Sequence, residues 1–372
     1  MVSLLVGARG VLWASLIILS MIGVSRLGSL DRECQPSRRR LGAMTQPDIL
    51  GAPYTAETID LGRDAEGPIV ATLVHRPADV GGADAAPQLP ASAQGKGGAA
   101  QPAVLYLHGF VDYFFQKDLG DWWAARGHDF YALDLRKYGR SLLPGQTPFY
   151  TENLDDYFED LTAAWQLITG RDGHQQVILM AHSTGGLIAS LWASRIAPPE
   201  LTALVLNSPW LDHFNNPLER ALMTGSVAAL ARFKPRAIVQ KEQEDAYARS
   251  LHAEHAGTWQ FNTDWKTLNF PPVYAGWLAA VRRAHRQLQR GLDIQAPVLL
   301  LTSARSGKLT NPTDRHDFDA VLNVQGTRRW GLGLGRDVTS RVIDGGTHDL
   351  VLSPEPARTA TYRAIGEFID RL

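Results

Sequence analysis

Cysteine is almost absent from this chain of 372 residues, which contains only Cys34. A single cysteine excludes an intramolecular disulfide and a metal cluster bound by several thiolates. An excess of charge is also missing, because 37 Lys and Arg residues nearly balance 38 Asp and Glu residues. This balance gives no electrostatic basis for binding nucleic acid, so we predict no nucleic-acid partner.

The N-terminus lacks an apolar run of the length that crosses a bilayer, which is about 20 residues. Its apolar segment, Val11–Val24, is shorter, lies between Arg9 and Arg26, and has the length of a signal-peptide core. We interpret residues 1–50 as an N-terminal extension with three alternative explanations. It is a signal or anchor that associates the protein with a membrane, or a start assigned too early for a cytoplasmic protein whose folded part follows Met44, or a helix that packs on the folded part.

The remaining residues, 51–372, alternate short apolar runs with amphipathic segments. This alternation predicts an α/β fold with a mostly parallel sheet covered by helices on both faces. Predicted strands cover 55–61, 68–76, 103–110, 129–141, 176–181, 201–209, 296–304 and 338–344, and predicted helices cover 118–127, 153–169, 185–197 and the C-terminus. Residues 79–102 are rich in small and polar residues, which predicts a flexible loop. Residues 209–296 interrupt the alternation and predict a helical cap inserted between two strands.

Three polar signals fall at the predicted carboxyl ends of strands, where an open parallel sheet binds its ligands. They are His108-Gly109-Phe110, Ser183 and His348. Ser183 follows an apolar strand, precedes a helix and lies in a small-x-Ser-x-Gly pattern, which is the context of a nucleophile elbow. Ala181 stands where glycine is commoner. We predict that Ser183 is a nucleophile and that Thr184 and Phe110 supply the oxyanion hole through their backbone N–H groups.

A serine hydroxyl needs a base, and a base needs an orienting acid. His348 follows a late strand and a Gly-Gly turn, where the histidine of a serine, acid, histidine order is expected. We predict that Asp319 is the acid because it directly precedes the apolar segment "AVLNV". Asp317 is the main alternative, Asp314 is another candidate, and Asp344 is too close to the base along the chain.

Other conspicuous side chains have simpler interpretations. His182, His128 and His174 are predicted to be structural or solvated, and Asp134 and Arg136 are predicted to organise a loop at the sheet end. Aromatic residues of the cap are more often core than binding surface, but Trp259, Phe261 and Trp265 are our candidates for lining an apolar substrate pocket. The sequence contains no metal-ligand spacing, phosphate loop or dinucleotide fingerprint, so we expect no metal or cofactor.

The segments "LHGF", "LDLRKYGRS", "NLDDYFEDL", "AHSTGG" and "GGTHD" together resemble the α/β-hydrolase superfamily. They are most similar to the branch that holds monoacylglycerol lipases, lysophospholipases and serine aminopeptidases. The resemblance covers about residues 55–372 and implies Ser183 as nucleophile, His348 as base, and Phe110 with Thr184 as oxyanion hole. The acid of the family usually follows its strand within a few residues, where this chain has Ser306.

These observations predict a serine hydrolase that cleaves a carboxylic ester, such as a lipid-like ester with an apolar acyl chain, through an acyl-enzyme. A first alternative is a serine aminopeptidase, which needs a carboxylate in the cap for the substrate ammonium, with Glu242, Glu244 and Asp245 as candidates. A second alternative is a non-catalytic small-molecule-binding protein with the same fold.

Overall fold

The computed structural model describes residues 45–79, 101–212, 217–314 and 316–372, and the side chains of helix α4 from residue 225 onward. Most of the predicted N-terminal extension, including Val11–Val24, and most of the predicted flexible loop 79–102 lie outside these ranges. Within them, no helix is long and apolar enough to cross a membrane.

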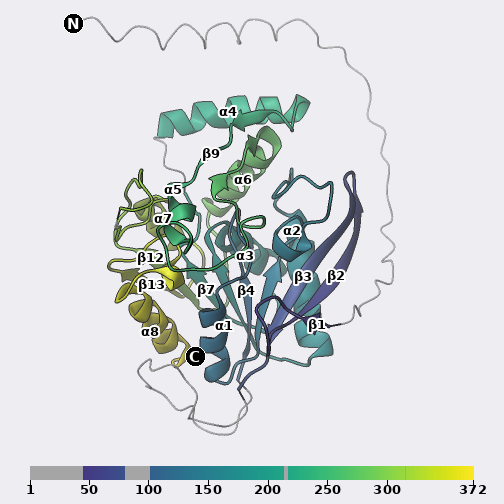
Figure 1. Cartoon of the computed structure of the whole chain (residues 1–372), viewed down its shortest axis with the longest axis vertical. Helices are drawn as coiled ribbons and strands as arrows, with labels where there is room; N and C mark the ends of the chain where they lie inside the picture. The colour runs from purple at the N-terminus through teal and green to yellow at the C-terminus, as the bar shows by residue number, and fades with distance from the viewer. Residues whose placement is uncertain (1–44, 80–100, 213–216, 315) are drawn as a thin grey trace, which may run out of the picture. The chain divides into compact units, whose positions relative to one another are not determined.

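A nine-stranded sheet forms the centre of the fold, in the order β1-β2-β3-β5-β4-β6-β7-β12-β13 (Figure 1). The strands β1, β2, β3 and β5 pair antiparallel, and the pairs from β5 to β13 are parallel. Their bounds are β1 Gln46–Pro47, β2 Thr55–Asp64, β3 Gly67–Arg76, β4 Ala103–Leu107, β5 Phe130–Asp134, β6 Val177–His182, β7 Leu201–Asn207, β12 Val298–Ser303 and β13 Val338–Ile343. This architecture confirms the predicted fold class.

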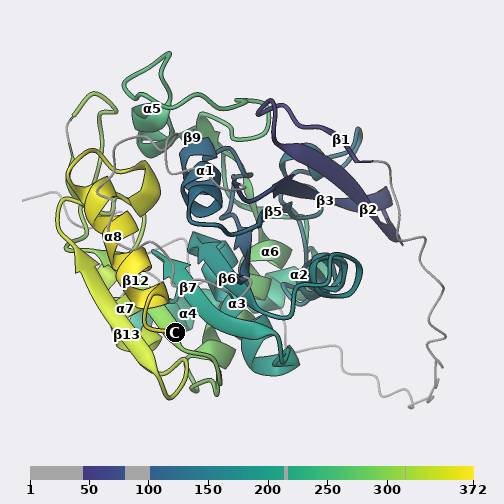
Figure 2. The ribbon, with the colours of Figure 1, turned by 90° about the horizontal axis from the view of Figure 1, so that it is seen from below.

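The central strands are buried on both faces, and alternate side chains enter two separate apolar cores. In β4, Leu105 and Leu107 face one core, whereas Val104 and Tyr106 face the other. The first core is covered by α2 (Asp156–Gln166), α3 (Ser183–Ile196) and α6 (Ala275–Leu288). The second core is covered by α1 (Lys117–Ala125) and α8 (Ala357–Ile369), on the opposite side of the sheet in Figure 2. Burial on both faces explains why these strands are continuous apolar runs.

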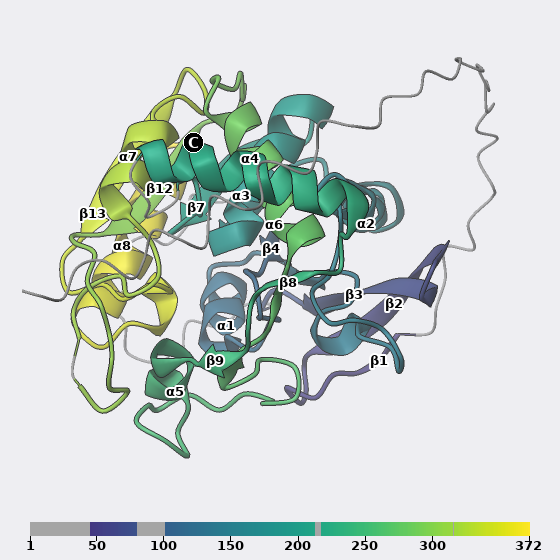
Figure 3. The same cartoon turned by 90° about the horizontal axis from the view of Figure 1, so that it is seen from above.

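The chain between β7 and β12 leaves the sheet and crosses its carboxyl end. It contains α4 (Pro217–Phe233), α5 (Ala246–Leu251) and α6. Two short antiparallel pairs accompany them, β8 (Ile238–Gln240) with β11 (Val273–Tyr274) and β9 (Gln243–Glu244) with β10 (Asn269–Phe270). Figure 3 shows α4 lying across α6. We call the described part of residues 209–296 the insertion.

Between β12 and β13 the chain forms a loop and then α7 (Val324–Gly331). This helix lies beyond the predicted acid region, and the sequence pattern did not predict it as a helix. Short helical turns complete the chain at Gly139–Ser141, Leu167–Arg171 and Leu350–Leu352.

Candidate active site

Ser183 lies at the turn that joins β6 to α3. Ala181 pairs with Leu107 of β4 on one side and with Leu206 of β7 on the other, so the turn begins in the middle of the parallel sheet. The helix begins at Ser183 itself, whose φ is +51°. A residue with a Cβ atom rarely adopts this conformation, and it persists only where the surrounding structure holds it. The turn therefore holds the hydroxyl at the carboxyl end of the sheet.

The small residues around Ser183 have direct steric causes. A Cβ atom on Gly185 would lie 2.2 Å from the carbonyl oxygen of His108, which no side chain can occupy. A Cβ atom on Gly109 would lie 3.0 Å from the Cβ of Ser183. Ala181 is fully buried but belongs to the regular strand, where its methyl group is accommodated. Of the two flanking positions, the one two residues after Ser183 requires glycine, whereas the one two residues before it accommodates alanine.

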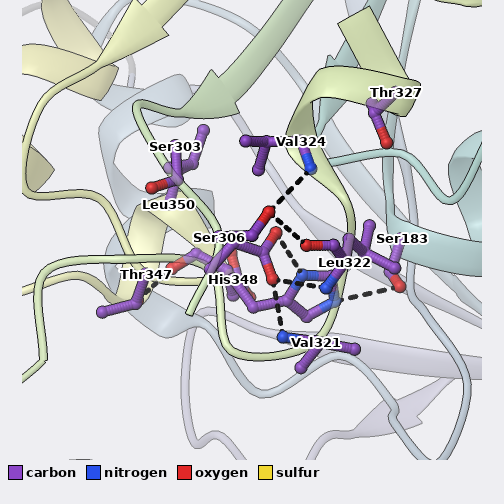
Figure 4. Close-up of polar contacts among 12 residues, drawn as sticks. Ser183, Ser303, Ser306, Val321, Leu322, Val324, Thr327, Thr347, His348 and Leu350 are labelled. Atoms are coloured by element: carbon purple, nitrogen blue, oxygen red, sulfur yellow. Dashed lines mark hydrogen bonds and ion pairs between the residues drawn. The ribbon is translucent and has the colours of Figure 1, made fainter. Parts of the chain in front are cut away.

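His348 and Asp319 complete a chain of hydrogen bonds with Ser183 (Figure 4). The Nε2 atom of His348 lies 3.0 Å from the Ser183 Oγ, and its Nδ1 atom lies 3.0 Å from the Asp319 Oδ2. The three side chains come from loops that follow β6, β12 and β13. All three residues are buried, with exposed fractions of 7% for Ser183, 4% for His348 and 0% for Asp319.

The environment of Asp319 favours its charged form. Burial by itself would raise the pKa of this carboxyl group, but the facing His348 and two backbone N–H groups outweigh burial and lower the pKa. Those N–H groups belong to Val321 and Leu322, and each lies 2.8 Å from Oδ1. An ionised Asp319 accepts a hydrogen bond from the Nδ1–H group of His348, which leaves the lone pair of Nε2 for the Ser183 hydroxyl.

The alternative aspartates are all exposed and lie elsewhere. Asp317 forms an ion pair with Arg305, and Asp314 and Asp344 are solvent-exposed. The structure therefore places Asp319, and none of these three, at the imidazole Nδ1.

Hydrogen bonds around Ser306 hold the long loop that carries Asp319 to His348. The Arg305 carbonyl accepts from the Asp319 N–H, and the Asp319 carbonyl accepts from the Gly307 N–H, both at 2.9 Å. The Ser306 hydroxyl donates to the Leu322 carbonyl at 2.7 Å and accepts from the Val324 N–H at 2.9 Å. The chain between these segments loops out and returns. Ser306 thus occupies the position expected for the acid but braces the acid loop.

The predicted oxyanion donors lie on either side of Ser183. Thr184 is the second residue of α3, so its N–H belongs to the first turn and has no acceptor within the helix. Phe110 follows Gly109, which packs against Ser183. His108 fixes this turn, because its Nδ1 donates to the Gly109 carbonyl at 2.8 Å and its Nε2 accepts from the Leu135 N–H at 3.1 Å. The arrangement can stabilise negative charge that develops next to Ser183 Oγ.

Two polar residues beside His348, the partly buried Tyr247 and the buried Asp349, were not singled out by sequence reasoning. Tyr247 of α5 contacts the imidazole edge to face, with ring centroids 5.7 Å apart, and its hydroxyl accepts from the Asp349 N–H at 2.8 Å. Asp349 also accepts from the Asn207 side chain at 2.6 Å. Asn207 ends β7, so the rule that polar groups at strand ends form the site could have found it.

The histidines predicted to be structural have structural contacts. His182 donates from Nδ1 to the Asn207 carbonyl at 3.1 Å, and burial lowers its pKa. A neutral His182 adds no positive charge next to His348, whose ring centroid is 4.8 Å away. His128 bonds the Pro102 carbonyl and His174 lies 3.3 Å from Asp129.

Asp134 and Arg136 organise the loop after β5, as predicted. Asp134 accepts from the Phe114 N–H and pairs with Arg140 at 2.9 Å. Arg136 donates from Nε to the buried Asp160 at 2.6 Å. Neither side chain is among the contacts of Ser183 or His348.

The aromatic residues predicted to line a pocket pack in the second core or against it, and Trp259 also borders a cavity of about 420 Å³ whose lining includes Thr347, the neighbour of His348. Trp259 donates from its indole nitrogen to the Leu352 carbonyl at 3.0 Å. The Phe261 ring lies 5.1 Å from that of Phe115, and the Trp265 ring lies 5.2 Å from that of Tyr113. These contacts are structural, which agrees with the expectation that aromatic residues of the cap are more often core than binding surface. No contact with the triad joins them to Ser183.

A different aromatic group lies beside Ser183. Phe110 stacks on Trp277 of α6 with centroids 4.1 Å apart, and Trp277 stacks on Trp210 at 6.0 Å. The Trp210 N–H donates to the Ser183 carbonyl at 2.9 Å. We call Phe110, Trp210 and Trp277 the aromatic wall. Trp210 follows β7 closely, so its place at a strand end was a usable signal. Trp277 lies in the first turn of α6, far along the chain from Ser183, and carried none.

No group of three or more His, Cys, Asp or Glu side chains that could hold a metal ion occurs in the part of the chain that the structure describes.

Comparison with known proteins finds a family model and a curated relative with similar sequences. The family model described as serine aminopeptidase, S33, matches residues 98–355. Lysophospholipase L2 of Escherichia coli strain K12 is 24% identical over 268 residues, which are 66% of this chain and 73% of that protein.

Solved structures share the fold. A soluble variant of the monoglyceride lipase from Saccharomyces cerevisiae has a TM-score of 0.60 at 14% identity, covering 90% of this chain and 98% of its own. A carboxyl esterase from Bacillus coagulans has a TM-score of 0.55 at 12% identity, covering 85% and 98%. The match to the family model spans more than half of the sequence, and the chain therefore belongs to the serine aminopeptidase S33 family and has the α/β-hydrolase fold.

Proposed function

We propose that this protein is a serine hydrolase that cleaves a carboxylic ester with an apolar acyl group through an acyl-enzyme. The observation that carries the proposal is the continuous hydrogen-bonded chain from Asp319 through His348 to Ser183. Its geometry matches the requirement that nucleophile, base and orienting acid lie within hydrogen-bond reach of one another.

In the first half of the proposed reaction, the Ser183 Oγ attacks the acyl carbon while His348 Nε2 takes the hydroxyl proton. The carbonyl oxygen becomes an oxyanion and accepts hydrogen bonds from the N–H groups of Thr184 and Phe110. The tetrahedral centre then collapses, the bond to the alcohol oxygen breaks, and His348 returns the proton to that oxygen. The products of this half are a free alcohol and an acyl ester on Ser183.

In the second half, water takes the place of the alcohol. His348 removes a proton from the water as its oxygen attacks the acyl carbon, and the same two N–H groups bind the second oxyanion. Collapse breaks the bond to Ser183, His348 protonates the serine oxygen, and the carboxylic acid leaves. Asp319 stays ionised throughout and stabilises the imidazolium that forms twice.

The aromatic wall supports an apolar acyl group. Phe110 and Trp210 are partly buried and Trp277 is buried, and all three lie next to the nucleophile or the oxyanion loop. An acyl chain that packs on these rings buries apolar surface at about 25 cal/mol per Å². The names of two similar proteins, a lysophospholipase and a monoglyceride lipase, also favour a lipid-like substrate.

Peptide cleavage from a free N-terminus is less well supported. It needs a carboxylate near Ser183 to bind an ammonium group, and the three candidates of the insertion are engaged elsewhere. Asp245 caps α5 by accepting from the N–H of Tyr247, Glu242 accepts from the Asn269 side chain, and Glu244 is exposed in the short strand β9.

A fluorophosphonate probe and p-nitrophenyl esters of graded chain length test the proposal. We expect the folded protein to be labelled at Ser183, and Ser183→Ala to lose labelling and about 10⁴-fold or more of kcat. Ser190→Ala is the matched control, since Ser190 lies in the same helix and donates to the Gly186 carbonyl. Unlabelled wild-type protein without esterase activity would leave the non-catalytic binding protein as the better interpretation.

A further inference from the structure

Asp349 is a buried carboxylate that the proposed reaction does not use. It follows the base directly in the sequence, and its exposed fraction is 2%. Among the described residues, three N–H groups donate to its carboxylate, and all three belong to neutral amides. A buried carboxylate is costly and persists only where hydrogen bonds satisfy its oxygens. The place of such a group next to His348 therefore points to a function.

Two side-chain amides donate to Asp349, and backbone contacts fix which way each amide points. Asn207 donates from Nδ2 to Oδ1 at 2.6 Å, while its own Oδ1 accepts from the Leu350 N–H at 3.1 Å. Gln116 donates from Nε2 to Oδ2 at 3.1 Å, while its Oε1 accepts from the Phe115 N–H at 3.1 Å. A backbone N–H can only donate, so it selects the amide oxygen and leaves the NH₂ group to face Asp349. Both carboxylate oxygens therefore act as acceptors.

These hydrogen bonds join three loops at the carboxyl end of the sheet. Asn207 ends β7, which is the neighbour of the strand that leads to Ser183. Gln116 lies between the oxyanion loop at Phe110 and the start of α1. Asp349 lies in the loop after β13. The loop that carries the base is therefore tied both to the strand beside the nucleophile and to the segment that follows the oxyanion loop.

The loop after β13 has to carry the base across the sheet. In the strand order, β7 and β12 separate β6, which precedes Ser183, from β13, which precedes His348. Neighbouring strands lie about 4.8 Å apart, so three strand spacings amount to about 14 Å. The distance of 3.0 Å between the His348 Nε2 and the Ser183 Oγ thus depends on how this loop is held.

The loop is anchored at the end of each strand that it crosses. Ser303, the last residue of β12, donates to the Gly346 carbonyl at 2.6 Å. Asn207, the last residue of β7, then holds both the Asp349 carboxylate and the Leu350 N–H. The anchor at Asn207 is the one nearer to β6, so it has the greater control over the position of the imidazole.

We propose that Asp349 is a positioning residue for the base, and this role rests on the proposed function of Ser183 and His348. The carboxylate holds the loop of His348 against Asn207 and Gln116 and so sets the distance between the imidazole Nε2 and the serine Oγ. Asp349 takes no proton itself and acts through His348.

Capping of the turn Leu350–Leu352 does not explain these contacts. The cap is the hydrogen bond from the Val351 N–H to Oδ1, which at 3.3 Å is the longest of the three. The two amide donors are 142 and 233 positions away along the chain, and together they engage both oxygens. A cap needs one acceptor oxygen, whereas two acceptor oxygens bonded to distant segments fix the loop in space.

The variant Asp349→Asn tests the proposal because it keeps the size of the side chain but turns an NH₂ group toward one of the two amide donors. We expect kcat for a p-nitrophenyl ester to fall about 10²-fold, since a displacement of about 1 Å at a reacting group costs that much. KM should stay within about threefold, because substrate contacts are unchanged. Fluorophosphonate labelling of Ser183 should slow by a factor similar to that of kcat.

Asp160→Asn is the matched control for loss of stability. Asp160 is also buried and accepts from Arg136, whose side chain is not among the contacts of Ser183 or His348. This variant should have a lower melting temperature and a kcat within about twofold of wild type when assayed well below that temperature. Equal loss of kcat in Asp160→Asn and Asp349→Asn would show a general effect of destabilisation and overturn the proposal.

An exchange of the two partners provides the rescue. In Asp349→Asn/Asn207→Asp the new amide can donate to the new carboxylate, and the Leu350 N–H and the Gln116 amide each keep an acceptor. The double variant should recover at least about tenfold of the kcat lost in Asp349→Asn, since restored hydrogen bonds return the loop to its place. Recovery of the melting temperature without recovery of kcat would show that Asp349 is structural only.

An NMR measurement separates failure of this proposal from failure of the proposed catalysis. The His348 Nδ1–H proton, which is shared with Asp319, should resonate at low field and be identified by its loss in Asp319→Asn. We expect Asp349→Asn to shift or broaden this resonance and the exchange variant to restore it, whether or not the protein hydrolyses esters. An inactive wild type with this response would refute the hydrolase and keep the positioning role. An unchanged resonance with full kcat in folded Asp349→Asn would refute the positioning role alone.

Discussion

Two regions meet at Ser183, and they are held in place by different means. The carboxyl edge of the sheet carries Ser183, Asp319 and His348 on loops that follow parallel strands, and backbone hydrogen bonds fix each loop. The insertion crosses this edge and is attached mainly through side chains. Lys266 pairs with Asp112 at 2.9 Å, and Arg236 pairs with Glu66 at 2.7 Å.

The difference follows from what each region must do. Proton transfer needs atoms held within a few tenths of an ångström, and strands in fixed register supply that rigidity. A surface that meets substrate needs only approximate placement, so the packing of α6 in the first core and a few ion pairs suffice. Changes at the sheet edge should therefore abolish activity, and changes at the contacts of the insertion should act on stability or selectivity.

The largest effect is expected at the acid. Asp319→Asn keeps the size of the side chain but removes the charge that orients and stabilises the His348 imidazole, and kcat for a p-nitrophenyl ester should fall about 10⁴-fold. Asp317→Asn is the matched control, because this residue is exposed and forms an ion pair with the exposed Arg305. It should retain activity within about twofold. Full activity in Asp319→Asn would contradict the proposed triad.

The second effect concerns the ion pair that joins the insertion to the oxyanion loop. The side chain of Asp112 is 3% exposed and that of Lys266 is 12% exposed. Lys266→Met leaves a buried carboxylate without its cation, and the free energy of unfolding should fall by about 3 kcal/mol at neutral pH. Urea unfolding measures this loss, and adding Asp112→Asn to the same variant should restore part of it. A double variant as unstable as the single one would show that the charge is not the cause.

The pH dependence of the same variant has a defined sign. In the wild type, burial would raise the pKa of Asp112, but the facing Lys266 outweighs burial and lowers it. A lowered pKa means that the wild type keeps this contribution above the unfolded pKa of about 3.9 and loses it only as the pH falls through the folded value. In Lys266→Met burial dominates and raises the pKa, so the destabilisation should shrink as the pH falls from 7 toward 5. A constant difference over this range would contradict the argument.

The sequence predicted the sheet edge better than the insertion, and the reason is physical. Buried parallel strands must be apolar runs, so most strands and the turn at Ser183 could be placed within a few residues. The order of Ser183, Asp319 and His348 then followed from the connectivity of the sheet. Asp319 was preferred because an apolar segment follows it, and that segment supplies the N–H groups of Val321 and Leu322.

Contacts between side chains distant in sequence left no comparable signal. Tyr247 meets His348 across 101 positions of chain, and Trp277 meets Phe110 across 167, so neither pairing has a local pattern. Trp259, Phe261 and Trp265 were conspicuous by composition alone, which does not separate a pocket from a core. The hydrogen bond from Ser306 to the Leu322 carbonyl could not be predicted, because the two residues are 16 positions apart and meet only in the folded loop.

A smaller effect tests the turn itself. Gly185→Ala places a methyl group 2.2 Å from the His108 carbonyl, so the turn must shift, with a cost of about 1–3 kcal/mol in unfolding free energy and a lower kcat. Ala181→Gly is the contrast, because it only removes a methyl from a regular strand and should cost less than about 1 kcal/mol. Thermal melting and ester hydrolysis measure both. Equal behaviour of the two variants would show that steric demand does not explain the pattern around Ser183.

The smallest effect separates the two aromatic groups. Trp277→Leu shortens the aromatic wall beside Phe110 and should change the preference between short and long p-nitrophenyl esters several-fold, about 1 kcal/mol in relative kcat/KM. Phe261→Leu is the counterpart in the second core, where the ring packs on Phe115 and His252. It should lower the melting temperature and leave the chain-length profile unaltered, because a core residue acts on the folded state and not on the bound ester. If Phe261→Leu changes the chain-length preference and Trp277→Leu does not, the acyl chain contacts Phe261, as the sequence first indicated. The insertion would then contribute to the site through the loop that carries Phe261 and not through α6.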